Sequence, residues 1–149
     1  MESSKKGIDL IKSFECLELK AYKCPAGIWT IGYGATFYQN GSKIKPGDKI
    51  SEKEADELLK YHIASFDLDV RKLLKTRVSQ VQFDALVSFA FNCGSAALGK
   101  STLLKKVNAN PNDPAIKHEF MKWIRSGGKV LNGLIRRRTA EVALYFSQN

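Results

Sequence analysis

A long run of apolar residues with helical spacing occupies the middle of the chain and limits the folds open to it. It begins at Ser51, where Ser-Glu-Lys-Glu has the spacing of a capping box ending at Glu54. The apolar residues then recur every three to four positions: Leu58, Leu59, Ile63, Phe66, Val70, Leu73 and Leu74. This pattern predicts one helix well beyond average length, with Ser65 as the one place where it could be interrupted.

Shorter helices are predicted on both sides of this long one. The stretch from Ser4 to Phe14 is amphipathic and should carry Glu15 at its end. A second capping box at Ser79 opens a helix that Asn92-Cys-Gly94 should end. Further helices are expected at residues 101–107, 114–124 and about 134–146. Everything after residue 50 is therefore expected to be helical.

A β-hairpin is predicted between the first helix and the long one. Residues 19–22 and 28–31 are rich in strand formers, and Pro25-Ala-Gly27 between them is typical of a turn. Cys24 then lies at the turn and Thr30 in the second strand. The predicted fold class is α+β and mostly helical.

Chain length and composition favour one folding unit. A chain of 149 residues with 44% hydrophobic residues can fill one core, so a single domain is expected over residues 1–149. No apolar run approaches the roughly 18 residues of a membrane span, which argues against stable membrane insertion. Three cysteines without metal-ligand spacing indicate neither a zinc site nor a disulfide framework.

The charge of the chain points to a polyanionic partner. With a formal charge of +9, the chain could attract nucleic acid, acidic cell-wall polymer or anionic lipid. Basic residues concentrate near the C-terminus, with Glu141 as the only acid after residue 120. This basic region is interpreted either as a solvated helix face or as a partner-binding patch.

One short segment combines an acid, a thiol and a hydroxyl. Glu15 is followed after eight residues by Cys24 and after five more by Thr30, and then by Ile-Gly-Tyr-Gly. With this spacing, and with the later stretches 82–94, 100–104 and 132–141, nearly the whole chain resembles the phage-type lysozymes, the endolysins of glycoside hydrolase family 24.

The resemblance implies an activity, a fold and site residues, and it implies no metal or organic cofactor. Members cleave the β-1,4 bond between N-acetylmuramic acid and N-acetylglucosamine in peptidoglycan. The cleft would lie between a small β-containing lobe at about residues 15–60 and a helical lobe at about 1–14 and 61–149. Glu15 would be the general acid, since a sugar oxygen leaves poorly until it is protonated. The implied substrate-binding residues are Thr36, Phe91, Asn92, Ser101 and Asn132.

Two positions depart from the family pattern. Cys24 stands where most members have aspartate, and Ala35 stands where many have histidine. A Cys24 thiolate could activate water as a base, with inversion, or attack the sugar as a nucleophile, with retention. Thr30 would hold the water or the cysteine in line. His62 and His118 are interpreted as surface or boundary residues of helices.

The resemblance also implies where such a protein works. An endolysin would accumulate as a monomer in the host cytoplasm and reach the cell wall after a separate permeabilising protein, a holin, opens the membrane. Bacterial peptidoglycan is therefore the expected partner, rather than nucleic acid. Two alternatives remain: a lytic transglycosylase, which needs the glutamate but no partner at Cys24, and a non-catalytic basic module that binds wall polymer or nucleic acid.

Overall fold

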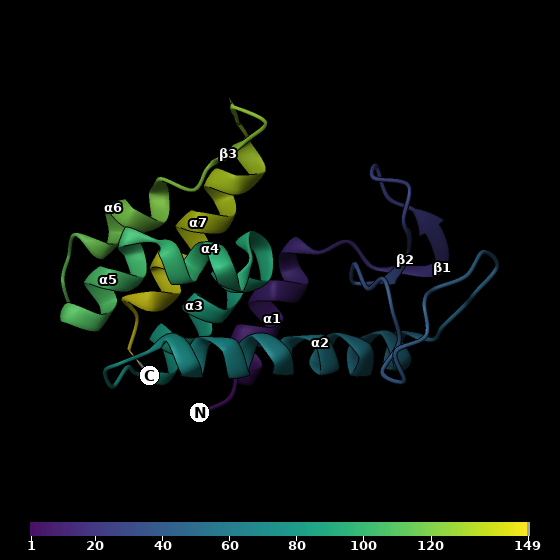
Figure 1. Cartoon of the computed structure of the whole chain (residues 1–149), viewed down its shortest axis with the longest axis horizontal. Helices are drawn as coiled ribbons and strands as arrows, with labels where there is room; N and C mark the ends of the chain where they lie inside the picture. Colours follow the sequence, from purple (N-terminus) through teal and green to yellow (C-terminus); the bar gives the residue numbers. More distant parts are fainter. Residues whose placement is uncertain (149) are drawn as a thin grey trace.

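The computed structural model describes residues 1–148 and shows two lobes joined by one long helix, α2 (Figure 1). Helix α2 (Glu52–Leu73) runs beneath both lobes, with the β-hairpin above one end and the other helices above the rest. It is continuous over 22 residues, so Ser65 causes no break, and both halves of the predicted capping box form at Ser51. The predicted long helix is confirmed.

The small lobe is built on a two-stranded antiparallel hairpin. Strands β1 (Glu18–Lys23) and β2 (Trp29–Gly32) pair with Tyr22 opposite Thr30. The turn between them contains Gly27, whose φ of 80° favours glycine. A separate small apolar core supports this lobe, formed by Ile31, Ala35, Ile44 and Leu58.

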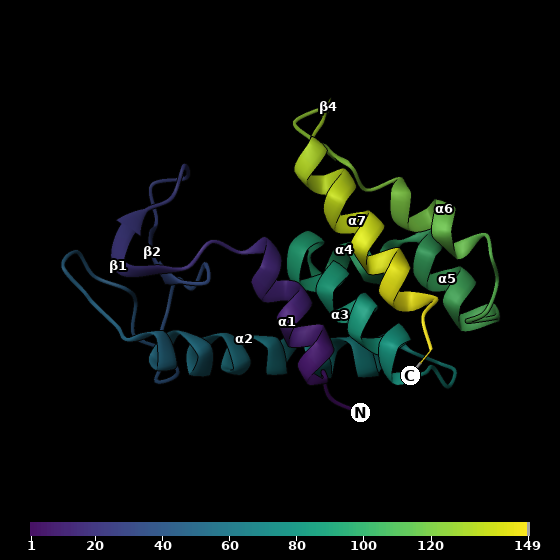
Figure 2. The ribbon, with the colours of Figure 1, turned by 180° about the vertical axis from the view of Figure 1, so that it is seen from behind.

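The helical lobe is organised around a central buried helix. All residues from 81 to 90 of α3 (Gln80–Cys93) are buried, because α1 (Lys5–Phe14), α2 and α7 (Asn132–Tyr145) pack around it (Figure 2). Three short helices complete the lobe: α4 (Ser95–Lys100), α5 (Thr102–Ala109) and α6 (Ile116–Met121). No helix within residues 1–148 is both long enough and apolar enough to cross a membrane.

The expectation that everything after residue 50 is helical is wrong at residues 125–130. Strands β3 (Arg125–Ser126) and β4 (Lys129–Val130) form a small hairpin there. Gly127 and Gly128 have φ values of 57° and 80°, and such a pair of glycines closes a tight turn instead of continuing a helix. Helix α6 is accordingly shorter than predicted, and α4 was not predicted because six residues are too few for a clear periodicity.

The N-terminal segment is fixed to the helical lobe by a buried carboxylate. Asp84 in α3 is fully buried. Its carboxylate accepts hydrogen bonds from the backbone amide of Ser4 at 3.0 Å, from the Ser4 hydroxyl, and from the side-chain amide of Gln80 at 2.9 Å. Ser4 is also the N-cap of α1, the helix that ends at Glu15. The anchor therefore determines where α1 begins and helps to position its far end.

We expect Asp84→Asn to lower the free energy of unfolding by about 1–3 kcal/mol, because an amide cannot accept all three hydrogen bonds in a buried site. Urea denaturation monitored by circular dichroism measures this change. Glu57→Gln, an exposed substitution on α2, is the control and should change stability by less than about 0.5 kcal/mol. Equal stability of the two variants would contradict the anchoring role of Asp84.

Candidate active site

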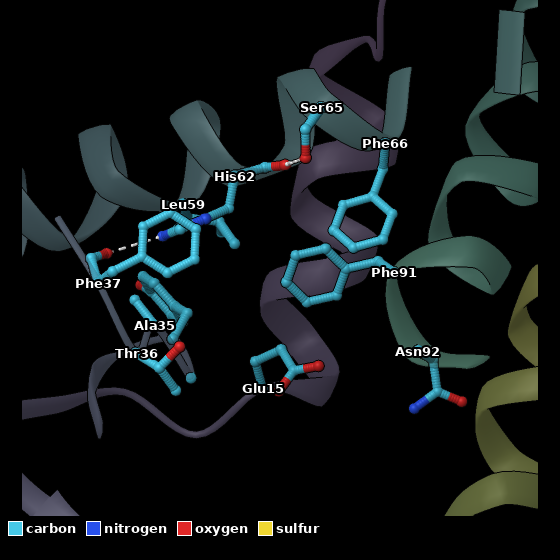
Figure 3. A pocket seen from close by; sticks show the side chains of 12 residues that line it. Glu15, Ala35, Thr36, Phe37, Leu59, His62, Ser65, Phe66, Phe91 and Asn92 are labelled. Carbon is cyan, nitrogen blue, oxygen red and sulfur yellow. Dashed lines mark hydrogen bonds between the residues drawn. The ribbon is translucent and has the colours of Figure 1, made fainter. Parts of the chain in front are cut away.

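A cavity of about 440 Å³ lies where the two lobes meet above α2 (Figure 3). One wall comes from the small lobe between Tyr33 and Phe37, and the opposite wall from Phe91 and Asn92 at the end of α3. The floor is the face of α2 that carries Leu59, His62, Ser65 and Phe66. The side chain of Glu15 faces this cavity from the end of α1.

Glu15 lies between the two lobes. It caps the C-terminal end of α1, and its backbone is already extended there. Its Oε1 atom accepts a hydrogen bond from Nη1 of Arg137 in α7 at 3.0 Å. Its Oε2 atom faces Gly34 in the small lobe. A Cβ atom placed on that glycine would lie 3.8 Å from this oxygen. One carboxyl oxygen is therefore held by the helical lobe, while the other faces the small lobe.

Arg137 belongs to a buried network of charges. Its Nε is 3.4 Å from Oε2 of Glu141, and Nη2 donates to the Ser88 carbonyl at 3.2 Å. Nε of Arg138 is 3.0 Å from the other oxygen of Glu141, and the Ser88 hydroxyl donates to Glu141 at 2.5 Å. Burial raises the pKa of the Glu141 carboxyl, although the two guanidinium groups act in the opposite direction. The network holds Arg137, and through it Glu15, in one orientation.

Cys24 and Thr30 lie together on the hairpin. The amide of Cys24 and the hydroxyl of Thr30 both donate to the Ile28 carbonyl at 3.0 Å. The pKa of the Cys24 thiol is lowered, mainly by hydrogen bonding to the backbone of Ile28 and to a smaller extent by the Thr30 hydroxyl. These contacts favour thiolate. Neither residue lines the 440 Å³ cavity.

Tyr22 is a neighbour of Thr30 that sequence reasoning did not single out. It is the cross-strand partner of Thr30 and precedes Cys24 by two positions, so the three side chains share one face of the hairpin. Burial raises the pKa of the Tyr22 phenol, and the nearby acidic groups Glu18, Cys24, Cys16 and Glu15 raise it further. A neutral phenol therefore stands within the electrostatic reach of both the acid and the thiol.

The five expected substrate-binding residues fall into different places. Thr36, Phe91 and Asn92 line the cavity. Ser101 is buried away from it, where it caps α5 by accepting from the Leu104 amide and donates to the Leu98 carbonyl at 2.6 Å. Asn132 is the exposed first residue of α7. The hydroxyl of Ser101 is thus occupied by local structure.

A second cavity of about 510 Å³ continues from the first and shares Glu15 and Asn92 with it. It is bounded by the end of α1 and the start of α7, including Leu131 and Gly133 on either side of Asn132. The two cavities together form a groove with Glu15 between its halves. An elongated ligand could lie along such a groove on both sides of the carboxyl.

Residues of α2 also line the cavity, which was not predicted from the sequence. His62, interpreted there as a surface or boundary residue, is half-buried and lines the cavity. His62 lies three residues after Leu59 and four before Phe66, and this spacing places all three on one face of a helix. The sequence therefore contained a pattern from which the position of His62 beside these apolar residues could have been predicted. Ala35 is buried in the opposite wall.

Comparison with known proteins gives a consistent set of matches. Residues 12–141 match the family model described as phage lysozyme. The chain is 49% identical over 149 residues to the endolysin of Bacillus phage B103, a match that covers 99% of this chain but 55% of that protein. The chain therefore spans just over half the length of that relative.

Solved structures resemble the whole chain. The endolysin from Escherichia coli O157:H7 phage FAHEc1 is 39% identical, with a TM-score of 0.90 over 99% of this chain and 94% of that one. The muramidase domain of SpmX from Asticaccaulis excentricus is 36% identical, with a TM-score of 0.86 over 99% of both chains. These similarities extend over both lobes and the groove between them.

Proposed function

The chain belongs to the phage lysozyme family, and from that premise we propose that it is an endolysin with muramidase activity. Its substrate would be bacterial peptidoglycan, and its reaction the hydrolysis of the β-1,4 bond between N-acetylmuramic acid and N-acetylglucosamine. The observation that carries this proposal is Glu15, a carboxyl held by Arg137 at 3.0 Å in the middle of a groove between two lobes.

Glu15 is proposed as the general acid. A glycosidic oxygen leaves poorly as an alkoxide, so the carboxyl must deliver a proton to it as the bond breaks. Arg137 occupies Oε1, which leaves Oε2 as the oxygen that carries the proton toward the sugar. Tyr22 stays a neutral phenol beside this acid and the thiol, and therefore adds no charge to the pair.

Cys24 is proposed as the partner of Glu15, with Thr30 holding it or the attacking water in line. Hydrogen bonds from the hairpin stabilise the thiolate. The thiolate could remove a proton from water, or attack the anomeric carbon to form a covalent intermediate that water then hydrolyses. The anomeric configuration of the first product distinguishes these routes: inversion indicates a base and retention a nucleophile.

Product analysis on purified peptidoglycan tests the proposed function. Mass spectrometry should show new reducing ends at N-acetylmuramic acid. A 1,6-anhydro end would instead identify a lytic transglycosylase. Intact glycan, with binding that weakens steeply as salt rises, would identify a non-catalytic basic module.

Replacement of Cys24 tests the thiol. We expect Cys24→Asp to keep appreciable activity, because a carboxylate can also act as base or nucleophile, and Cys24→Ala to lose most activity. Turbidity loss of permeabilised cells measures both. Cys16→Ala, which removes an exposed thiol from the same lobe, is the control and should leave activity unchanged. Full activity in Cys24→Ala would exclude a chemical role for the thiol.

The pH dependence of the reaction should report the same thiol. Because the thiolate is the active form, the rate should fall as the pH drops through the lowered pKa of Cys24. In Cys24→Asp the fall should move to lower pH, since an unperturbed aspartate titrates at about 3.9. Profiles of kcat/KM between about pH 4 and 9 measure this. If the rates of the wild type and of Cys24→Asp fell over the same range of low pH, a thiolate mechanism would be contradicted.

We also propose that residues 1–149 act as one monomeric lysozyme-like domain that reaches the wall from the host cytoplasm after a holin opens the membrane. Membership of the phage lysozyme family supports the cell wall as the destination. Expression in a bacterium without a holin should leave the culture turbid, and chloroform should then cause rapid lysis. Lysis without permeabilisation would contradict the proposed dependence on a separate protein.

A further inference from the structure

Phe37 is an apolar ring left partly open to solvent in the wall of the groove. It is 41% exposed and lines the 440 Å³ cavity on the small-lobe side, across from Phe91 and Asn92 (Figure 3). Exposed rings in a cavity are suited to contact apolar faces of a ligand. The ring follows Thr36 directly, a residue already expected to bind substrate.

His62 holds Phe37 by two separate contacts. Nε2 of His62 lies 3.1 Å from the Phe37 carbonyl oxygen, and the two rings meet edge to face at 85° with centroids 4.5 Å apart. Among residues 1–148 this carbonyl has no other hydrogen-bond partner. The His62 side chain thus holds both the backbone and the ring of Phe37.

The position of His62 makes this contact a link between parts of the molecule. His62 lies near the middle of α2, the helix that joins the lobes, whereas Phe37 belongs to the loop after the hairpin. Both residues line the cavity together with Glu15. The contact therefore sets the distance between the floor and one wall of the groove.

We propose that Phe37 contacts the pyranose ring or acetamido methyl of an N-acetylated sugar, and that His62 is the positioning residue that presents it. This inference deepens the proposed function and rests on it. Phe37 would act on binding alone, because it carries no group that can donate or accept a proton. Its loss should therefore raise KM and leave kcat nearly unchanged.

The test uses a soluble tetrasaccharide of alternating N-acetylglucosamine and N-acetylmuramic acid. For Phe37→Ala we expect KM to rise about tenfold with kcat changed less than about twofold, and for Phe37→Tyr we expect values near wild type. Leu19→Ala is the matched control: Leu19 is also 41% exposed in the small lobe but lines neither cavity of the groove. An unchanged KM in Phe37→Ala would overturn the inference.

Substitutions of His62 separate positioning from mere structural support. His62→Ala should raise KM about three- to fivefold, and His62→Gln, which keeps a donor for the Phe37 carbonyl, should recover part of the loss. Thermal unfolding shows whether the fold is intact. A rise in KM that simply follows the loss of stability in both variants would overturn the positioning role.

Calorimetric titration of the tetrasaccharide into Glu15→Gln, and into the double variants that combine Glu15→Gln with Phe37→Ala or with Leu19→Ala, measures binding without turnover. If the wild type cleaves the tetrasaccharide and Phe37→Ala binds it as tightly as Leu19→Ala, the inference fails while the proposed function stands. If the wild type binds but does not cleave, and Phe37→Ala weakens binding about tenfold, the sugar contact stands while the muramidase proposal fails.

Discussion

Glu15→Gln should reduce the rate of peptidoglycan cleavage by about 10²–10⁴-fold, the contribution typical of a positioned general acid. The amide is nearly the same size, and its oxygen can still accept the hydrogen bond from Arg137. Loss of the proton, not loss of the fold, is therefore the change that matters. Release of reducing ends from purified peptidoglycan measures the rate.

Glu57→Gln is the control for this substitution. Glu57 is an exposed glutamate on α2 and lines neither cavity of the groove. Its replacement should leave the rate within about twofold of wild type, as expected for a surface side chain without partners in the site. If Glu15→Gln retained comparable activity, Glu15 could not be the acid.

Glu141→Ala should lower the free energy of unfolding by about 3–5 kcal/mol, the cost of removing one partner from a buried charge network. Glu141 is fully buried, and its two oxygens contact Arg137 at 3.4 Å and Arg138 at 3.0 Å. Without it, two buried guanidinium groups lose their shared carboxylate. For a chain of this length the melting temperature should fall by roughly 6–20 °C.

Calorimetry and urea denaturation measure this loss, and Asp9→Ala provides the contrast. The ion pair between Asp9 and Lys5 is exposed, so its removal should cost less than about 1 kcal/mol. At temperatures where Glu141→Ala is folded, we also expect slower cleavage, because Arg137 loses a contact that orients it toward Glu15. Similar stability of the two variants would contradict the network as described.

The groove was only partly predictable from the sequence. Thr36, Phe91 and Asn92 were expected to bind substrate and do line the cavity, since the motifs that carry them resemble a known family closely. Ser101 was expected there too, but its hydroxyl caps α5. A capping role depends on where the preceding helix ends, and α4 is too short to be recognised from apolar periodicity.

The buried network was harder to foresee. The basic region near the C-terminus, which includes the three arginines at residues 136–138, was interpreted as a solvated helix face or a partner-binding patch, yet Arg137 and Arg138 are buried. Sequence reasoning favours exposure because unpaired charges rarely leave water. Here Glu141 pairs with both arginines and the Ser88 carbonyl accepts from Arg137, and Ser88 lies far away in the sequence.

The features that could be predicted from the sequence are local ones. Helix starts at Ser51 and Ser79, the hairpin around Cys24 and the place of Glu15 just after a helix follow from capping, turn chemistry and periodicity, which act over a few residues. Tertiary structure alone decided the contacts of Glu15 with Arg137 and of His62 with Phe37. Both join residues that are distant along the chain, and no short-range pattern records which distant side chains packing brings together.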